Sequence, residues 1–119
     1  MRVALDAEPL TLTSGGLKRY VEELTQALRA EYPQDEYLYL PHLRNFLERR
    51  WWLYGAERAS AKLQVDVYHG TNFAIPFFAR RPTVLTVHDL SPWRETRWHS
   101  SVAAARIRRR TLFYLLRRT

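Results

Sequence analysis

The feature that most constrains the fold of this chain is a short apolar run joined by a glycine-containing turn to a strongly periodic segment. Residues 2–7, RVALDA, are almost wholly small or apolar, which is typical of a buried strand. From residue 17 onward, apolar residues follow the spacing i, i+3, i+4, i+7, i+10 and i+11, which predicts an amphipathic helix. Its apolar face consists of Leu17, Tyr20, Val21, Leu24, Ala27 and Leu28. A strand, a turn and a helix in this order favour an α/β fold.

Strand and helix signals continue to alternate along the chain. Segments rich in β-branched or aromatic residues predict three further strands: EYLYL (36–40), VDVYHG (65–70) and TVLTVHDL (83–90). Helical segments are expected at 42–63, with Gly55 as a break, and from about residue 99 onward. Ser14 is the expected N-cap of the first helix, and Pro33 follows its end. This order predicts a Rossmann-like open parallel sheet of about four strands flanked by helices.

Length and composition limit the class of protein. The 119 residues fit one domain, so residues 1–119 are expected to form a single unit. No run approaches the ~18–20 apolar residues of a membrane span, and the N-terminus lacks a signal-peptide pattern. The chain has no cysteine, which excludes a disulfide framework and a thiolate metal site. A cytoplasmic location is therefore expected.

The positive charge is concentrated near one end of the sequence. The net charge is +7, and residues 94–119 carry all of it, with eight arginines and one glutamate. The rest of the chain contains 11 cationic and 11 anionic residues, so no general nucleic-acid surface is expected. The four tryptophans do not interleave with basic residues and are predicted to pack rather than to stack on bases. They are Trp51, Trp52, Trp93 and Trp98.

Polar residues follow the predicted strands at the end where parallel α/β sheets bind ligands. Asp6 ends the first strand, and two further predicted strands end near His69 and His88. Lys18 and Arg19 stand at a helix start, where the helix dipole disfavours cations unless an anion is bound. The predicted site comprises Gly15, Gly16, Arg19, His69, Gly70, Asn72, His88 and Asp89.

Each of these residues also has a purely structural explanation. Glycines before helices are common, and the full G-x-G-x-x-G spacing is missing around Gly15 and Gly16. His69 and His88 equally suit a role as donors that fix loops through nearby carbonyls. A metal site of both histidines with Asp89 lacks supporting ligand spacing, so no metal is expected.

Five blocks of the sequence resemble, in order, the N-terminal domain of glycosyltransferase family 4, the group-1 retaining glycosyltransferases. The blocks are MRVALDAEPL, GGLKRYVEEL, DEYLYL, DVYHGTNFAIP and PTVLTVHDLSPWRETRWH. The resemblance implies a GT-B architecture, in which two Rossmann-like domains face each other across a cleft. It also implies a nucleotide-sugar co-substrate, a sugar acceptor held mainly by the N-terminal domain, and no metal or other cofactor.

The resemblance also assigns roles to individual residues. Gly15 and Gly16 match a glycine-rich loop that approaches the donor's phosphates, and Arg19 would offset negative charge there. His88 and Asp89 match a His-Asp pair at the catalytic centre, where the histidine faces the transferred sugar. The acceptor side matches His69, Gly70 and Asn72.

The sequence departs from the family pattern in three places. Glu8 stands where the family often has a basic residue, and the stretch before VDVYHG is short. The sequence ends at Thr119, before the C-terminal domain that supplies the nucleotide pocket. The expectation is therefore an acceptor-side half of a retaining glycosyltransferase, inactive alone and completed by a C-terminal half in trans. The alternative is a non-catalytic, self-associating α/β module that binds carbohydrate or serves a structural role.

The basic tail has apolar residues among its arginines. Val102, Phe113 and Leu116 lie among Arg106, Arg109, Arg110 and Arg117 on one side of the expected helix. An apolar patch ringed by cations indicates a contact surface, and a homodimer is expected. The competing partner is the inner face of a membrane, contacted peripherally through residues 99–118.

Overall fold

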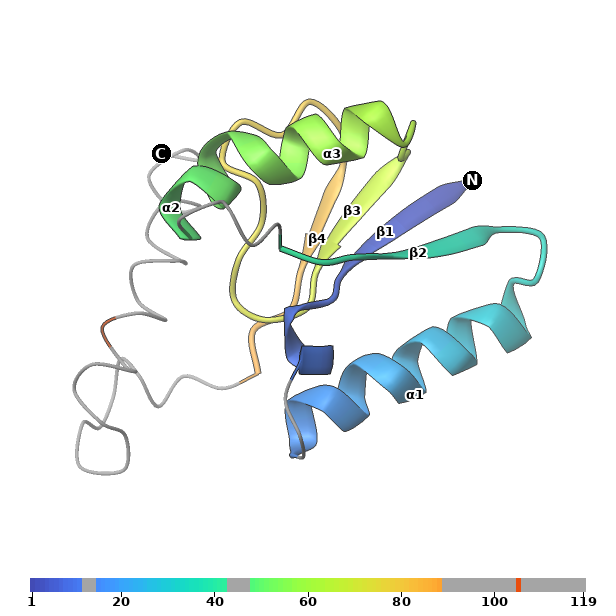
Figure 1. Ribbon diagram of the computed structural model, residues 1–119. Helices are drawn as coiled ribbons and strands as arrows, with labels where there is room; N and C mark the ends of the chain where they lie inside the picture. The colour runs from blue at the N-terminus through green and yellow to red at the C-terminus, as the bar shows by residue number, and fades with distance from the viewer. Residues whose placement is uncertain (12–14, 43–47, 89–104, 106–119) are drawn as a thin grey trace.

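Four parallel strands form the centre of the structure, a computed structural model that describes residues 1–11, 15–42, 48–88 and 105 (Figure 1). The strands are β1 (Arg2–Asp6), β2 (Glu36–Leu40), β3 (Val67–Gly70) and β4 (Thr83–Leu85). All pairs are parallel, and the strand order is β2-β1-β3-β4. The predicted fold class, an α/β fold with an open parallel sheet of Rossmann type, is confirmed.

Helices cover both faces of this sheet. The longest, α1 (Gly16–Glu31), lies on one face, while α2 (Glu48–Arg50) and α3 (Ala56–Lys62) lie on the other (Figure 1). The remaining helical segments are η1 (Glu8–Thr11) and η2 (Trp51–Gly55). Within the described ranges, no helix has the length and apolar character needed to cross a membrane.

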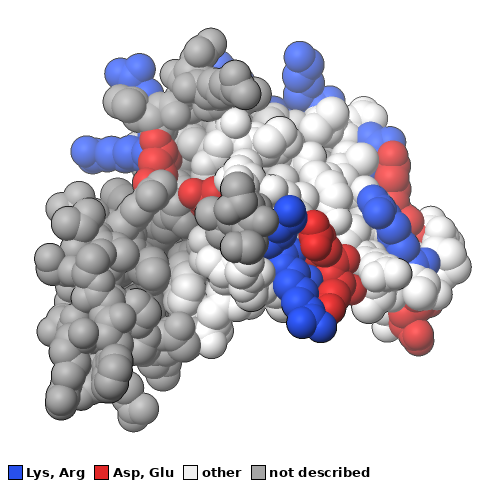
Figure 2. Space-filling model, turned by 60° about the horizontal axis from the view of Figure 1, so that its bottom comes forward, with Lys and Arg blue, Asp and Glu red and all other residues white. Residues whose placement is uncertain are grey.

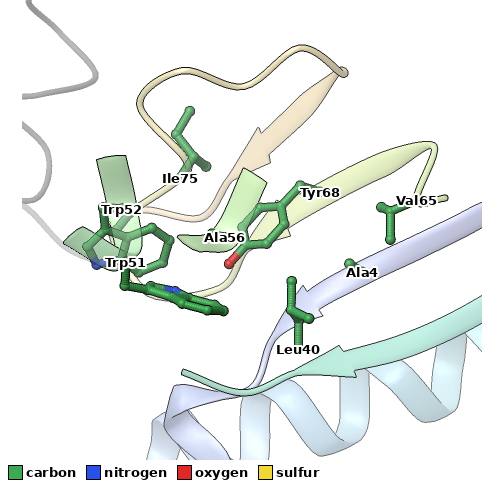
Figure 3. Packing of buried hydrophobic residues seen from close by; sticks show 9 residues of the cluster. Ala4, Leu40, Trp51, Trp52, Ala56, Val65, Tyr68 and Ile75 are labelled. Carbon is green, nitrogen blue, oxygen red and sulfur yellow. The ribbon is translucent and has the colours of Figure 1, made fainter. Parts of the chain in front are cut away.

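Alternation along β1 divides the core into two layers. Val3 and Leu5 pack with Tyr37 against the α1 side, where Leu24 and Leu28 complete the cluster. Successive side chains of a strand point to opposite faces, so Ala4 faces the other side. There it packs with Leu40, Trp51, Trp52, Ala56, Val65, Tyr68, Ala74 and Ile75 (Figure 3). Trp51 and Trp52 therefore belong to the core, as their sequence context predicts.

The first helix agrees with its sequence pattern at its C-terminal end but not at its N-cap. It runs from Gly16 to Glu31, and Pro33 follows directly after its C-cap residue, Tyr32. Ala27 is exposed, while the other residues of the predicted apolar face are buried or half-buried. The N-cap is Gly15, without a side-chain capping bond, so the prediction of Ser14 as the N-cap is wrong; Ser14 itself lies outside the described residues.

Gly55 does not break the second helical region, so that prediction is wrong. Its φ and ψ of −62° and −49° are ordinary helical values, and the chain stays helical from η2 into α3. The irregularity is instead a π-helical turn, closed by the bond from the Ala56 N–H to the Trp51 carbonyl. This turn carries both tryptophans onto the sheet.

Two strands are shorter than their sequence patterns predict. β3 begins at Val67 because the Val65 N–H bonds to the Ser60 carbonyl and the preceding Gln64 has φ of 54°. Regular pairing in β4 ends at Leu85, although the Thr86 N–H still bonds to the Gly70 carbonyl. Residues 89 and 90 of the predicted fourth strand lie outside the described part of the chain.

Charged side chains of both signs are mixed on the described surface. Figure 2 shows basic and acidic groups next to one another. Arg2 Nε is 2.8 Å from Glu36 Oε2. Arg19 Nε is also 2.8 Å from Oε1 of Glu23, which lies one turn further along the helix, and this pair is exposed. The arginine-rich tail, on which the expected dimer and membrane contacts depend, lies outside the described residues except for Ala105.

Candidate functional site

The strand order places a topological switch point between β1 and β3. From β1 the chain crosses to β2 on one side of the sheet, and it then returns to β3 on the other side. In open α/β sheets, ligands bind beyond the carboxyl ends of the strands at such a point. The predicted site residues that the structure describes lie at the end of β3, in the loops after β3 and β4, and at the start of α1.

A chain of hydrogen bonds connects three of these segments. The Tyr20 hydroxyl on α1 is 2.9 Å from Thr86 Oγ1, just after β4. The same Thr86 oxygen is 2.8 Å from Nε2 of His69 on β3. Residues as far apart in sequence as 20 and 86 are thus joined by one hydroxyl, which orients the His69 ring.

His88 lies beside this chain of bonds. Its Nε2 is 2.7 Å from the Thr71 carbonyl oxygen, and because a carbonyl only accepts, Nε2 carries the proton. The ring meets Tyr20 edge to face with centroids 4.9 Å apart, and it meets Phe73 at 5.6 Å. The bond to Thr71 is the loop-fixing bond that the structural explanation of this histidine predicts.

Phe73 stores backbone strain next to His88. It is buried and has φ of 62°, in the left-handed region that bulky residues avoid. Its N–H bonds to the Thr86 carbonyl at 3.1 Å, which helps to hold this conformation. Strained backbone of this kind is concentrated at ligand sites, so it adds weight to the site at this edge.

Partial burial favours the neutral form of His69. Loss of contact with water lowers the pKa of its imidazole, and the negative charge of Asp6 only partly opposes this effect. A neutral imidazole offers one donor and one acceptor nitrogen, which suits hydrogen bonding to hydroxyl groups such as those of a sugar.

The glycine pair opens the start of α1. Gly15 has φ of 118°, a conformation that favours glycine, and a Cβ at either Gly15 or Gly16 would meet nothing within 4 Å. Backbone N–H groups at a helix start attract anions. The Arg19 guanidinium, predicted to assist there, bonds instead to Glu23 at 2.8 Å on the exposed side of the helix.

The remaining predicted site residues differ in their positions and surroundings in the structure. Gly70 is buried, and a Cβ on it would overlap the backbone carbonyl of Ala74, so close packing alone explains this glycine. Asn72 is half-buried in the loop after β3. Asp89 lies outside the described residues.

The sequence did not identify several residues that build the site. Tyr20 was expected only on the apolar helix face, and Thr71, Phe73 and Thr86 were not expected to orient a histidine. The one available signal was a tyrosine, with a polar end, four residues after the glycine pair. A second polar group, Asp6, Glu8 and His42, meets on the other face of the sheet.

Comparison of the chain with protein-family models, with curated proteins and with solved structures finds no match.

Proposed function

We propose that this chain is the acceptor-side unit of a retaining glycosyltransferase that takes a sugar from a nucleotide-sugar donor. The observation that carries the proposal is the meeting of Tyr20, His69 and His88 at the carboxyl edge of a parallel sheet, beside an open helix N-terminus. The resemblance of the sequence blocks to glycosyltransferase family 4 supports the same reading.

The arrangement suits the chemistry of sugar transfer. Departure of a nucleoside diphosphate develops negative charge, and N–H groups at the start of α1 would stabilise that charge. The absence of a side chain at Gly15 and Gly16 leaves room for a ligand to approach the backbone closely. Neutral His69 and the aromatic surface of Tyr20 would hold sugar hydroxyls and a sugar face.

The donor nucleotide would be bound by a second unit of the same architecture, whichever polypeptide carries it. We therefore expect the 119 residues alone to show no transfer, with acceptor binding as their own contribution. His88 and Asp89 would act at the transferred sugar, and Gly70 and Asn72 would border the acceptor.

Amide NMR spectra of the isolated chain test the site without the second unit. Pyrophosphate should shift the amide signals of Gly15 and Gly16, and simple methyl glycosides should shift those near His69 and His88. Gly16→Val should abolish the pyrophosphate shifts, whereas Gly16→Ala, a smaller side chain in the same open space, should weaken them less. Shifts that spread over the opposite strand ends, or that survive Gly16→Val unchanged, would contradict the proposed site.

A further inference from the structure

Asp6, Glu8 and His42 lie together on the face of the sheet opposite α1. Asp6 shares the face of Ala4, because residues two apart along a strand point the same way. The register pairs Asp6 with Leu40 of β2, and the Ala7 N–H continues the pairing with a bond to the Leu40 carbonyl. Glu8 lies two residues after Asp6, and His42 lies two residues after Leu40. The segments that leave β1 and β2 therefore bring these two side chains to one place.

The donor atoms of the three side chains are close enough to share an ion. One ligand atom from each lies within 4.8 Å of the others, and Asp6 Oδ1 is 3.3 Å from His42 Nε2. Ligand atoms that share a tetrahedral Zn²⁺ at ~2.0–2.2 Å lie roughly 3.3–3.6 Å apart. The indole rings of Trp51 and Trp52, 5.0 and 5.2 Å from the imidazole, hold His42 in this position.

The contact between Asp6 and His42 is not a hydrogen bond. Nε2 of His42 is a buried atom that has no hydrogen-bond partner within the described ranges, although the carboxylate oxygen is near. Two polar atoms this close that do not meet hydrogen-bond geometry are arranged as two ligands of one ion would be. An ordinary His–Asp pair would align them as donor and acceptor.

Burial adds to the need for a partner at this place. Asp6 is fully buried; its Oδ1 accepts the Glu8 N–H at 3.1 Å, while Oδ2 has no hydrogen-bond partner in the described part of the chain. The buried hydroxyl of Tyr68, which also lacks such a partner there, extends from β3 toward Trp51 and Trp52 (Figure 3). Burial and the charges of Asp6 and Glu8 raise the pKa of this hydroxyl well above its ordinary value.

We propose that Asp6, Glu8 and His42 bind a divalent transition-metal ion, with Zn²⁺ the best fit. Two carboxylates and one imidazole are a donor set that zinc and its neighbours accept, and a fourth position would hold water or a further ligand. The ion would supply the missing partner of the buried carboxylate. This inference does not rest on the proposed sugar transfer, because the site lies on the other face of the sheet and uses none of the same residues.

Titration of the tag-free chain tests this site directly. After treatment with a chelator and dialysis, calorimetric titration with ZnCl₂ should show one ion bound per chain. CoCl₂ should give the visible absorption bands of a protein-bound cobalt ion. His42→Phe keeps an aromatic ring against the two tryptophans while removing the ligand, and it should weaken Zn²⁺ binding at least about 100-fold. Glu8→Gln should weaken it about tenfold or more.

His69→Gln is the matched control, since it removes a half-buried histidine on the other face of the sheet. It should bind Zn²⁺ as the unaltered chain does. Circular dichroism melts would show that each variant is folded. The proposal is overturned if folded His42→Phe binds Zn²⁺ as tightly as the unaltered chain, if His69→Gln loses as much affinity, or if ZnCl₂ produces no binding heat.

Discussion

His69 is a half-buried histidine whose hydrogen bond to Thr86 and lowered imidazole pKa arise from the same position in the sheet. The sequence predicts a polar residue near the end of β3, because VDVYHG turns from apolar to polar there. It does not predict which hydroxyl orients the ring, since Thr86 and Tyr20 reach His69 only through tertiary packing. Residue types could thus be predicted, whereas their partners depended on the register of β3 and β4.

Acid should destabilise the fold through His69. Its folded-state pKa lies below the ordinary value near 6.5, so the unfolded chain binds the proton more readily. The contribution of neutral His69 to the free energy of unfolding is therefore complete above about pH 6.5. It is lost as the pH falls toward the folded-state pKa. Urea unfolding at about pH 7.5 and about pH 5.5 measures it, and His69→Gln should reduce the difference. An equal pH dependence in both proteins would contradict this role.

Gly70 and Gly16 should respond oppositely to alanine. Gly70→Ala forces a Cβ onto the backbone carbonyl of Ala74 and should destabilise the chain by about 1–3 kcal/mol or more. Gly16→Ala meets open space at the first residue of α1 and should leave stability unchanged or raise it by up to about 1 kcal/mol. Parallel urea titrations of the two variants test this, and equal losses of stability would show that the packing argument is wrong.

At the scale of elements, the second helical region illustrates what periodicity can predict. The sequence indicates a helix between β2 and β3, and the structure has one from Glu48 to Lys62. The π-helical turn was not predicted, because it is set by the packing of Trp51 and Trp52 on the sheet rather than by local propensity. The predicted strand ends were wrong for a related reason. A strand stops where its neighbour stops pairing with it, and no local sequence pattern indicates that point.

Arg81 should hold α3 to the chain entering β4. Its guanidinium is 2.8 Å from Glu57, with side chains only 15% and 12% exposed, and it also donates to the Ser60 and Val65 carbonyls. Arg81→Ala would leave Glu57 half-buried without its charge partner and should cost about 2–4 kcal/mol of unfolding free energy.

Thermal or urea unfolding of Arg81→Ala measures this loss. Arg19→Ala is the control, because it removes an exposed pair with Glu23 and should change stability little. Similar effects of the two substitutions would contradict a special role for the Arg81 contacts.

At the scale of the whole molecule, the alternation of strands and helices predicted the parallel α/β architecture correctly. The position of His69 and His88 near the carboxyl edge of the sheet was also predictable, because that edge follows from the topology. The cluster of Asp6, Glu8 and His42 was not, since it depends on the pairing of β1 with β2.

The arginine-rich tail should join two copies of the chain. Its apolar residues Val102, Phe113 and Leu116 lie among arginines in the sequence, and a second copy would cover them. Light scattering across a dilution series should show a dimer that dissociates on dilution. A monomer at all concentrations would exclude the homodimer, and salt-sensitive binding of that monomer to anionic vesicles would assign the tail to a membrane surface.

Sugar transfer itself tests the central claim most directly. The chain is combined with a candidate GT-B donor-binding unit and with a panel of nucleotide sugars and acceptor glycosides. The product anomer is then assigned by NMR. We predict transfer with retention only when both units are present. The transfer rate should be at least about 100-fold lower with folded His88→Ala. Transfer at ~1 per second or more by the 119 residues alone, inversion of the anomer, or full activity of His88→Ala would contradict the account.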